Sequence, residues 1–301
     1  MKTKEFFINF SGLYSDFPTG IAGRSAIDLT SLDGTNCYCS GDASDVIRKA
    51  LSEVPSEALH WIDTGDYHYA SLFFLEKIRT PVTLFLFDHH PDDQDSAFGT
   101  DILSCGNWVA RARQLPNQTA DFLIDKFPQP GTTGPRSGID GSQPVTTYSQ
   151  TGTTGLQTNA VESSAAAIPQ TRTAGPHPVT TGPRPEIAGL QSETTGPQTE
   201  IADLQGNSKC CRGKGNRPKA YLSIDKDVMC RDSARTNWDQ GDMTLQELKD
   251  LIIRISYKYD IIGADVCGGL TESKGAGAED LKINCATDAE LRELLLNLMI
   301  V

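Results

Sequence analysis

The chain has 301 residues and a formal net charge of −12 at pH 7. This negative charge excludes nucleic acid and anionic membrane surfaces as favoured partners, because both repel an acidic protein. No stretch approaches the roughly 20 consecutive apolar residues of a membrane-spanning helix, and we expect no signal peptide. The eight cysteines show no zinc-ribbon spacing. We therefore expect a cytoplasmic protein with reduced thiols.

Apolar runs alternate with amphipathic stretches in two parts of the chain. Strands are expected near 5–10, 58–62, 82–88 and 120–124 and, after a long gap, near 220–225 and 260–266. Helices are expected near 43–53, 69–78, 105–114, 244–258 and 287–299. Thr244 and Thr287 each begin a Thr-x-x-Glu pattern, which is typical of a helix start. The alternation predicts an α/β fold with three α/β/α layers and a mainly parallel sheet.

Residues 128–215 interrupt this alternation. They contain one aromatic residue, Tyr148, among many Gly, Thr, Pro, Ser and Gln residues. Such a segment cannot bury enough apolar surface to offset the entropy of ordering the chain. We interpret it as a disordered insertion, with a partner-binding arm as the alternative. Residues 1–127 and 216–301 would then form a single domain of roughly 200 residues, which is enough for one substantial core.

Three of the expected strands are followed by side chains that can bind metal ions. These side chains are His68, Asp88, His90, Asp92, Asp225 and Asp227. Open α/β sheets bind their ligands at the carboxyl ends of the strands, and a divalent cation can neutralise several acids in one place. Mixed imidazole and carboxylate ligands favour two hard or borderline cations, with manganese first. The alternative for the separate motifs is a solvated acidic loop, an acidic turn and a structural histidine.

These motifs resemble those of the arginase and agmatinase (ureohydrolase) superfamily. Residues 88–92, Asp-His-His-Pro-Asp, are similar to its Asp-x-His-x-Asp box. Residues 223–227, Ser-Ile-Asp-Lys-Asp, are similar to its Ser-x-Asp-x-Asp box. Residues 65–68, Gly-Asp-Tyr-His, resemble its Gly-Gly-Asp-His box with one residue inserted before the histidine. The resemblance covers about 1–127 and 216–301, and it implies an arginase-like fold.

The resemblance also implies a hydrolase that cleaves a C–N bond in a guanidino or amidino-type small molecule. Two Mn²⁺ ions bridged by a hydroxide would supply the nucleophile. One ion would be held by His68, Asp88, Asp92 and Asp225, and the other by Asp88, His90, Asp225 and Asp227. The catalytic residues implied are Asp92 and Asp265, and Asp265 would hold the guanidinium group of the substrate.

The chain departs from the family at Val109, which stands where the family has a histidine that acts in proton transfer. This departure indicates a divergent hydrolase rather than an arginase. It leaves open a metal-binding module without turnover, unless His89 or Tyr67 takes over proton transfer. A DHH-type manganese phosphoesterase is a further alternative, because 88–90 read Asp-His-His after an apolar strand. The early acidic box of that family is missing after 6–10.

Overall fold

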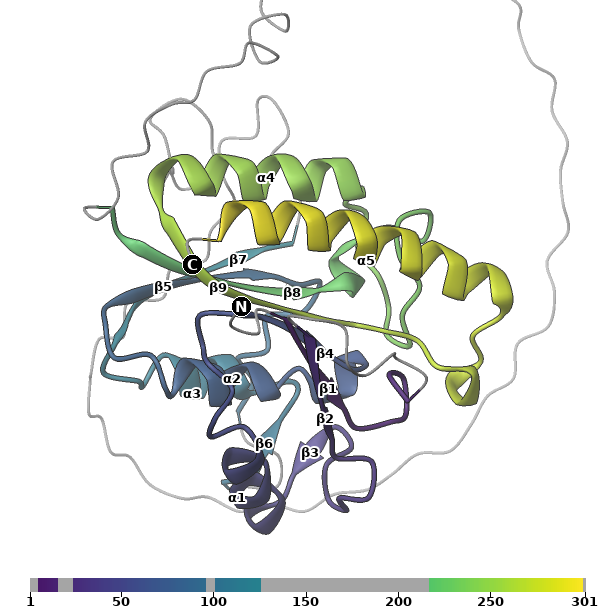
Figure 1. Ribbon diagram of the computed structural model, residues 1–301, viewed down its shortest axis with the longest axis horizontal. Coiled ribbons are helices and arrows are strands. Elements are labelled where there is room, and N and C mark those ends of the chain that lie inside the picture. The colour runs from purple at the N-terminus through teal and green to yellow at the C-terminus, as the bar shows by residue number, and fades with distance from the viewer. Residues whose placement is uncertain (1–4, 16–23, 96–100, 126–216, 300–301) are drawn as a thin grey trace, which may run out of the picture. The chain divides into compact units, whose positions relative to one another are not determined.

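Seven parallel strands form the main sheet in the part of the chain that the structure describes, in the order β2-β1-β4-β9-β8-β5-β7 (Figure 1). The structure is a computed structural model, and it describes residues 5–15, 24–95, 101–125 and 217–299. The strands are β1 (Glu5–Asn9), β2 (Arg24–Asp28), β4 (Leu59–Ile62), β5 (Val82–Phe87), β7 (Gln118–Ile124), β8 (Lys219–Asp225) and β9 (Asp260–Cys267). The expected insertion, 128–215, lies outside the described residues and stays a prediction.

Helices cover both faces of this sheet. The helices α1 (Gly41–Ala50), α2 (Ala70–Leu75) and α3 (Trp108–Ala112) lie on one face, and α4 (Leu245–Lys258) and α5 (Ala278–Leu298) lie on the other (Figure 1). One hydrophobic cluster, which includes Ile47 and Phe73, fills the first interface, and another, which includes Ile252 and Leu295, fills the second. Strands between two helical layers are buried on both sides, which explains the continuous apolar run of β5. The predicted three-layer α/β/α fold is confirmed.

A second, antiparallel sheet pairs β3 (Tyr38–Cys39) with β6 (Leu103–Ser104). Neither strand was expected from the sequence, and nor was β2. Two residues are too few to show an alternating pattern, and β2 is largely polar. Short 3₁₀ turns, η1 (Gly65–Tyr67), η4 (Lys226–Val228) and η5 (Glu272–Lys274), follow β4, β8 and β9.

The two expected helix starts have different outcomes. Thr244 caps α4 as predicted: its hydroxyl accepts from the Glu247 N–H, and the Glu247 carboxylate accepts from the Thr244 N–H at 2.8 Å. The start expected at Thr287 is wrong, because α5 already begins at Ala278. Thr287 lies inside that helix, where its hydroxyl donates to the Ser233 carbonyl. The Thr-x-x-Glu pattern at Thr287 therefore does not mark a helix start, and its threonine instead binds the loop at Ser233.

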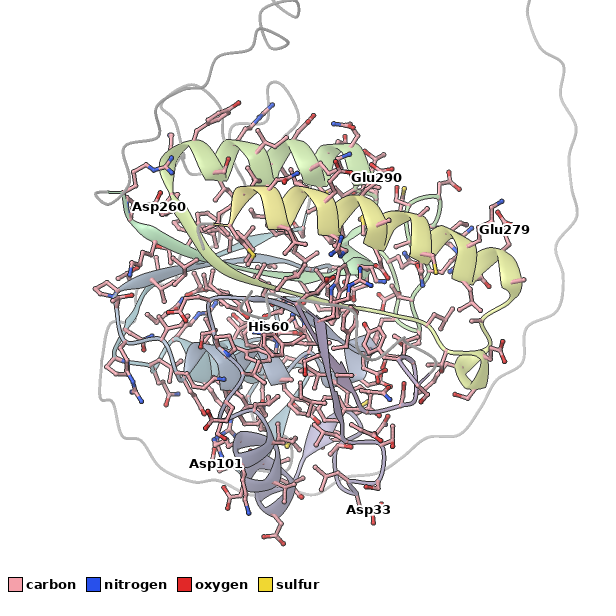
Figure 2. All side chains as sticks on the ribbon, viewed as in Figure 1. Asp33, His60, Asp101, Asp260, Glu279 and Glu290 are labelled. Carbon is pink, nitrogen blue, oxygen red and sulfur yellow. The ribbon has the colours of Figure 1, made fainter. Side chains whose placement is uncertain are left out.

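His60 is a structural histidine in the core. Figure 2 places it in the interior, whereas the labelled acids Asp33 and Glu279 lie at the periphery. Its ring nitrogens are 3.1 Å from the Tyr221 hydroxyl and 2.9 Å from the Pro55 carbonyl oxygen. Burial lowers the pKa of His60 to about 3, so the ring is neutral. Among the described helices, none is both long and apolar enough to cross a membrane.

Candidate metal centre

The carboxyl ends of β4, β9, β8 and β5, which are neighbours in the sheet, bring all six predicted ligand side chains together. We call His68, Asp88, His90, Asp92, Asp225 and Asp227 the Asp–His cluster. Within it, ligand atoms of His68, Asp88 and Asp92 lie within 4.8 Å of one another. The same holds for Asp88, His90 and Asp227, and for His68 and Asp225 together with Cys267.

The contacts inside the Asp–His cluster are short. His68 Nδ1 lies 3.1 Å from both Asp88 Oδ2 and Asp92 Oδ2, and 3.6 Å from Asp225 Oδ2. Both His68 Nδ1 and Asp88 Oδ2 are buried, and neither has a hydrogen-bond partner among the described residues. Buried polar atoms normally do have one. The lone pairs of His68 Nδ1 and Asp88 Oδ2 point into the same space without a hydrogen bond between them, an arrangement that can bind a cation.

The electrostatics of the cluster support this view. Burial raises the pKa of Asp92 and of Asp227. Burial, together with repulsion from Asp227 and Asp88, raises the pKa of Asp225 to about 7. Hydrogen bonds to Asp227 and Asp88 raise the pKa of His90 to about 11. The carboxylates therefore require protons or cations beside them, and the oxygen and imidazole donors fit divalent manganese.

The backbone and the surrounding residues fix the orientation of these side chains. Trp108 Nε1 donates to Asp92 Oδ2 at 2.8 Å, and Asp92 itself has a φ of 48°, in the left-handed region. The His90 N–H donates to Asp88 Oδ1 at 2.7 Å. Gly268, with a φ of 81°, permits the close approach of the backbone, since a Cβ there would lie 2.3 Å from Asp225 Oδ1. The site is thus rigidly built.

Asp265 lies deeper in the sheet than the Asp–His cluster. It is fully buried in β9, and it is not among the residues that line the cavity described below. Ser223 Oγ donates to Asp265 Oδ1 at 2.7 Å, and the same Oγ lies 2.9 Å from His68 Nε2. Asp265 pairs in register with Ser223, two residues before the end of β8, which explains its depth. The expected contact between Asp265 and the substrate stays a prediction, and the hydrogen bonds of Ser223 connect Asp265 to His68.

This chain of hydrogen bonds also assigns the tautomer of His68. Ser223 has one hydroxyl hydrogen, and we assign it to Asp265 Oδ1 at 2.7 Å rather than to Ser71 Oγ at 3.3 Å; the hydroxyl oxygen then accepts from His68 Nε2–H. In the neutral ring, Nδ1 is then the acceptor that faces the carboxylates. A hydroxyl group that holds the other ring nitrogen in this way is typical of metal-binding histidines.

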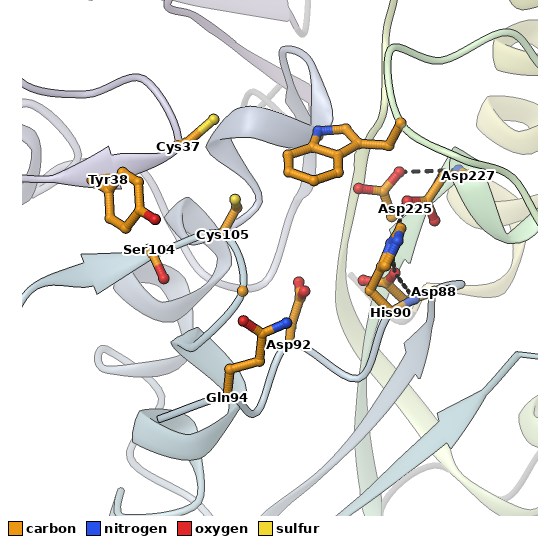
Figure 3. A pocket seen from close by; sticks show the side chains of 13 residues that line it. Cys37, Tyr38, Asp88, His90, Asp92, Gln94, Ser104, Cys105, Asp225 and Asp227 are labelled. Atoms are coloured by element: carbon orange, nitrogen blue, oxygen red, sulfur yellow. Dashed lines mark hydrogen bonds and ion pairs between the residues drawn. The ribbon is translucent and has the colours of Figure 1, made fainter. Parts of the chain in front are cut away.

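A cavity of about 260 Å³ opens beside the Asp–His cluster. In Figure 3, Asp88, His90, Asp225 and Asp227 lie across the cavity from Cys37, Tyr38, Ser104 and Cys105 of the small sheet. Gln94 and Trp238 also line it. Trp238 Nε1 donates to Asp66 Oδ1 at 3.0 Å, which holds the indole ring 5.8 Å from the His90 ring. The size lies just below the range of about 300–1,000 Å³ of small-molecule pockets.

Cys267 is a neighbour of the cluster that sequence reasoning missed. Its thiol is buried and donates to Asp225 Oδ2 at 3.1 Å. The sequence did contain a hint, because Cys267 is the last residue of β9 and so lies at the strand end where the cluster side chains gather. Only the register with β8, which pairs Cys267 with Asp225, shows that it reaches the site.

The expected substitutes for a proton-transfer histidine lie elsewhere. Val109 is buried in the core, and its N–H donates to the Asp92 carbonyl at 3.0 Å. Tyr67 stacks on Phe10, with ring centroids 4.4 Å apart. Neither Tyr67 nor His89 is among the described residues that line the cavity.

Comparison with solved structures shows the fold of the chain. An arginase from Medicago truncatula is 12% identical with a TM-score of 0.50, and the match covers 98% of this chain and 87% of that one. A formimidoylglutamase from Bacillus subtilis subsp. subtilis str. 168 is 11% identical with a TM-score of 0.50, covering 100% and 90%. The chain therefore has the arginase-like ureohydrolase fold, with buried His and Asp clusters at its strand ends.

Comparison of sequences adds less. No protein-family model matches the chain. An uncharacterized protein from Thermotoga maritima is 22% identical over 208 residues, which are 69% of this chain and 56% of that protein. The chain thus spans little more than half the length of this curated relative.

Proposed function

We propose that the chain is a divergent metallohydrolase with the arginase-like fold, which uses two Mn²⁺ ions to cleave a C–N bond in a guanidino or amidino-type small molecule. The observation that carries the proposal is the convergence of all six cluster side chains at one edge of the sheet. The unpaired, buried His68 Nδ1 and Asp88 Oδ2 support it. The fold shared with proteins named as an arginase and a formimidoylglutamase supports the substrate class.

The ligand sets are those that the family resemblance implies. One ion would be held by His68, Asp88, Asp92 and Asp225, and the other by Asp88, His90, Asp225 and Asp227; the groups His68/Asp88/Asp92 and Asp88/His90/Asp227 of the structure support them in part. When bound, two divalent cations lower the pKa of a shared water molecule and polarise the carbon atom that is attacked. Cys267 stands beside the first set, where its thiol would favour a softer metal than manganese.

The remaining cavity residues suit a small cationic substrate. Tyr38 and Trp238 line the cavity and are 47% and 37% exposed, so that both can offer a ring face to a planar cation. Gln94 adds an amide that can accept a hydrogen bond from an N–H group. Because Asp265 lies beneath the site, we assign substrate binding to these three residues instead.

Asp92 is the carboxyl group that we assign to proton transfer. It lines the cavity, and Trp108 and His68 hold it in place. Burial raises its pKa above the ordinary value, which favours a carboxyl group that can hold and release a proton. In this arrangement no histidine at position 109 is required.

A substrate screen tests the proposal. The protein with added Mn²⁺ is incubated with guanidino compounds, amides and phosphodiesters, and urea, ammonia and phosphate are measured. We expect urea or ammonia from a guanidino or amidino compound, lost in Asp227→Asn and kept in the exposed control Asp232→Asn. Phosphate release would instead assign the chain to the DHH-type phosphoesterases. Tight Mn²⁺ binding without any product would favour a metal-binding module.

A further inference from the structure

Two cysteines lie at opposed positions on the cavity wall across from the Asp–His cluster. Cys37 directly precedes β3, and Cys105 directly follows β6. The antiparallel register pairs Tyr38 with Ser104, so the next pair outward is Cys37 with Cys105. The Cys105 N–H donates to the Cys37 carbonyl at 2.9 Å, which extends the ladder by this pair.

The backbone geometry of this pair is suitable for a disulfide bond. Directly opposed residues of an antiparallel hydrogen-bonded pair have Cα atoms about 5.5 Å apart. A disulfide spans Cα separations of about 4.4–6.8 Å. Both cysteines are free and half-buried, and both line the cavity (Figure 3). A bond between them therefore requires side-chain rotation and little backbone movement.

The two thiols differ in chemical character. A hydrogen bond from Cys105 lowers the pKa of Cys37 and outweighs burial and Asp66, which act in the opposite direction. The same hydrogen bond, together with burial, raises the pKa of Cys105. Cys37 is thus the thiol that forms a thiolate first, and Cys105 is the thiol that stays protonated.

The backbone of Cys37 is itself unusual. Its φ is 58°, in the left-handed region that residues other than glycine rarely adopt. Conformations of this kind cluster at functional sites, where the surrounding structure holds them in place. Here the ladder bond to Cys105 provides that support, and the conformation keeps the thiol at the cavity wall.

We propose that Cys37 and Cys105 form a thiol–disulfide exchange site that reacts with low-molecular-weight disulfides entering the cavity. The Cys37 thiolate attacks one sulfur atom of the disulfide RSSR, which forms a mixed disulfide and releases RS⁻; this anion takes up the proton that Cys37 lost. Cys105 Sγ then attacks the Cys37 sulfur, and the second RS⁻ leaves with the Cys105 proton. The protein loses two electrons, and RSSR is reduced to two RSH.

Oxidised glutathione is the probe that tests this site. The reduced, full-length protein is incubated with it, the remaining thiols are alkylated, and peptides are mapped by mass spectrometry without reduction. We expect a crosslinked Cys37–Cys105 peptide as the main internal disulfide. The Cys105→Ser variant should stop at a glutathione adduct on Cys37, and Cys37→Ser should form no crosslink. Cys285→Ser, which removes an exposed thiol on α5, should leave the crosslink unchanged.

Reactivity at Cys285 without a Cys37–Cys105 crosslink in the wild type would overturn the proposal. It would also be overturned by a crosslink that forms equally fast in urea, because the folded geometry would then contribute nothing. Thermal unfolding of each variant reports whether it folds, and if Cys105→Ser does not fold, the wild-type crosslink decides. The outcome is independent of hydrolytic activity, because no metal takes part in the exchange.

Discussion

The substitution Asp225→Asn in the metal-free protein should alter how stability depends on pH. Asp225 is buried, and its pKa is raised to about 7, first by burial and then by repulsion from Asp227 and Asp88. An aspartate in an unfolded chain has a pKa of about 3.9. A carboxyl group with a raised pKa binds its proton more tightly in the folded state. Its stabilising contribution is therefore fully present in acid and is lost as pH rises through the folded pKa.

The size of the effect follows from this shift. Between pH 6 and 8 the folded protein releases the Asp225 proton, while the unfolded chain is already deprotonated, so the wild type loses about 1.4 kcal/mol. Three histidines with shifted pKa values also contribute, because in the unfolded chain they titrate near pH 6.5. His90, with its pKa raised to about 11, and His68, with its pKa raised well above its ordinary value, destabilise as pH rises, and His60, with its pKa lowered to about 3, does the opposite. All three are present in the variant as well, so the difference between the two proteins reports Asp225 together with its effect on Asp227 and Asp88.

The assay is urea unfolding followed by circular dichroism at pH 6, 7 and 8 with a chelator. The free energy of unfolding of Asp225→Asn, relative to wild type, should increase by about 1.4 kcal/mol from pH 6 to pH 8. The control Asp232→Asn should follow the wild type. Mn²⁺ at about 100 times its Kd should stabilise the wild type by about 2.7 kcal/mol, and the variant less. Parallel pH profiles for wild type and Asp225→Asn would refute the reasoning.

Two further substitutions test other parts of the account. Ser223→Ala removes the hydroxyl that links His68 to Asp265, and it should lower Mn²⁺ affinity about 10-fold or more in calorimetric titrations. Ser56→Ala, at a buried serine that bonds the Phe74 carbonyl, should leave that affinity unchanged, and equal affinities in both variants would contradict the positioning role. Replacing 128–215 by a Gly/Ser linker of about 15 residues, enough for a parallel crossover from β7 to β8, should preserve Mn²⁺ binding and Tm. A large drop in Tm would show that the segment stabilises the domain.

Much of the fold could be predicted because several strands are buried on both faces. The run Val82–Phe87 is apolar at every position except Thr83, and β5 has these bounds. The convergence of the cluster side chains could be predicted for a related reason. Polar residues at the end of such a run must lie at the edge of a parallel sheet, and the edges of neighbouring strands meet. Asp88 and Asp225 follow this logic, and the 3₁₀ turn η1 after β4 brings His68 to the same edge.

How far a residue of one strand lies from the ligand-binding edge of the sheet could not be predicted in the same way. Whether Asp265 or Cys267 reaches the site depends on the register between β9 and β8, which is set by tertiary packing and not by local pattern. The pairing of Cys37 with Cys105 likewise joins two very short strands far apart in sequence. The start of α5 was missed because residues 278–286 mix charged, small and apolar residues, most of them exposed, with little apolar periodicity.

The most direct test of the proposed metal centre is the manganese content of the purified protein. After dialysis against Mn²⁺ and then against metal-free buffer, elemental analysis should find two ions per chain in the wild type and in Asp232→Asn. The variants Asp88→Ala and Asp225→Ala, which remove the two carboxylates shared by both ligand sets, should retain almost none. Equal manganese content in the wild type and in these two variants would contradict the account.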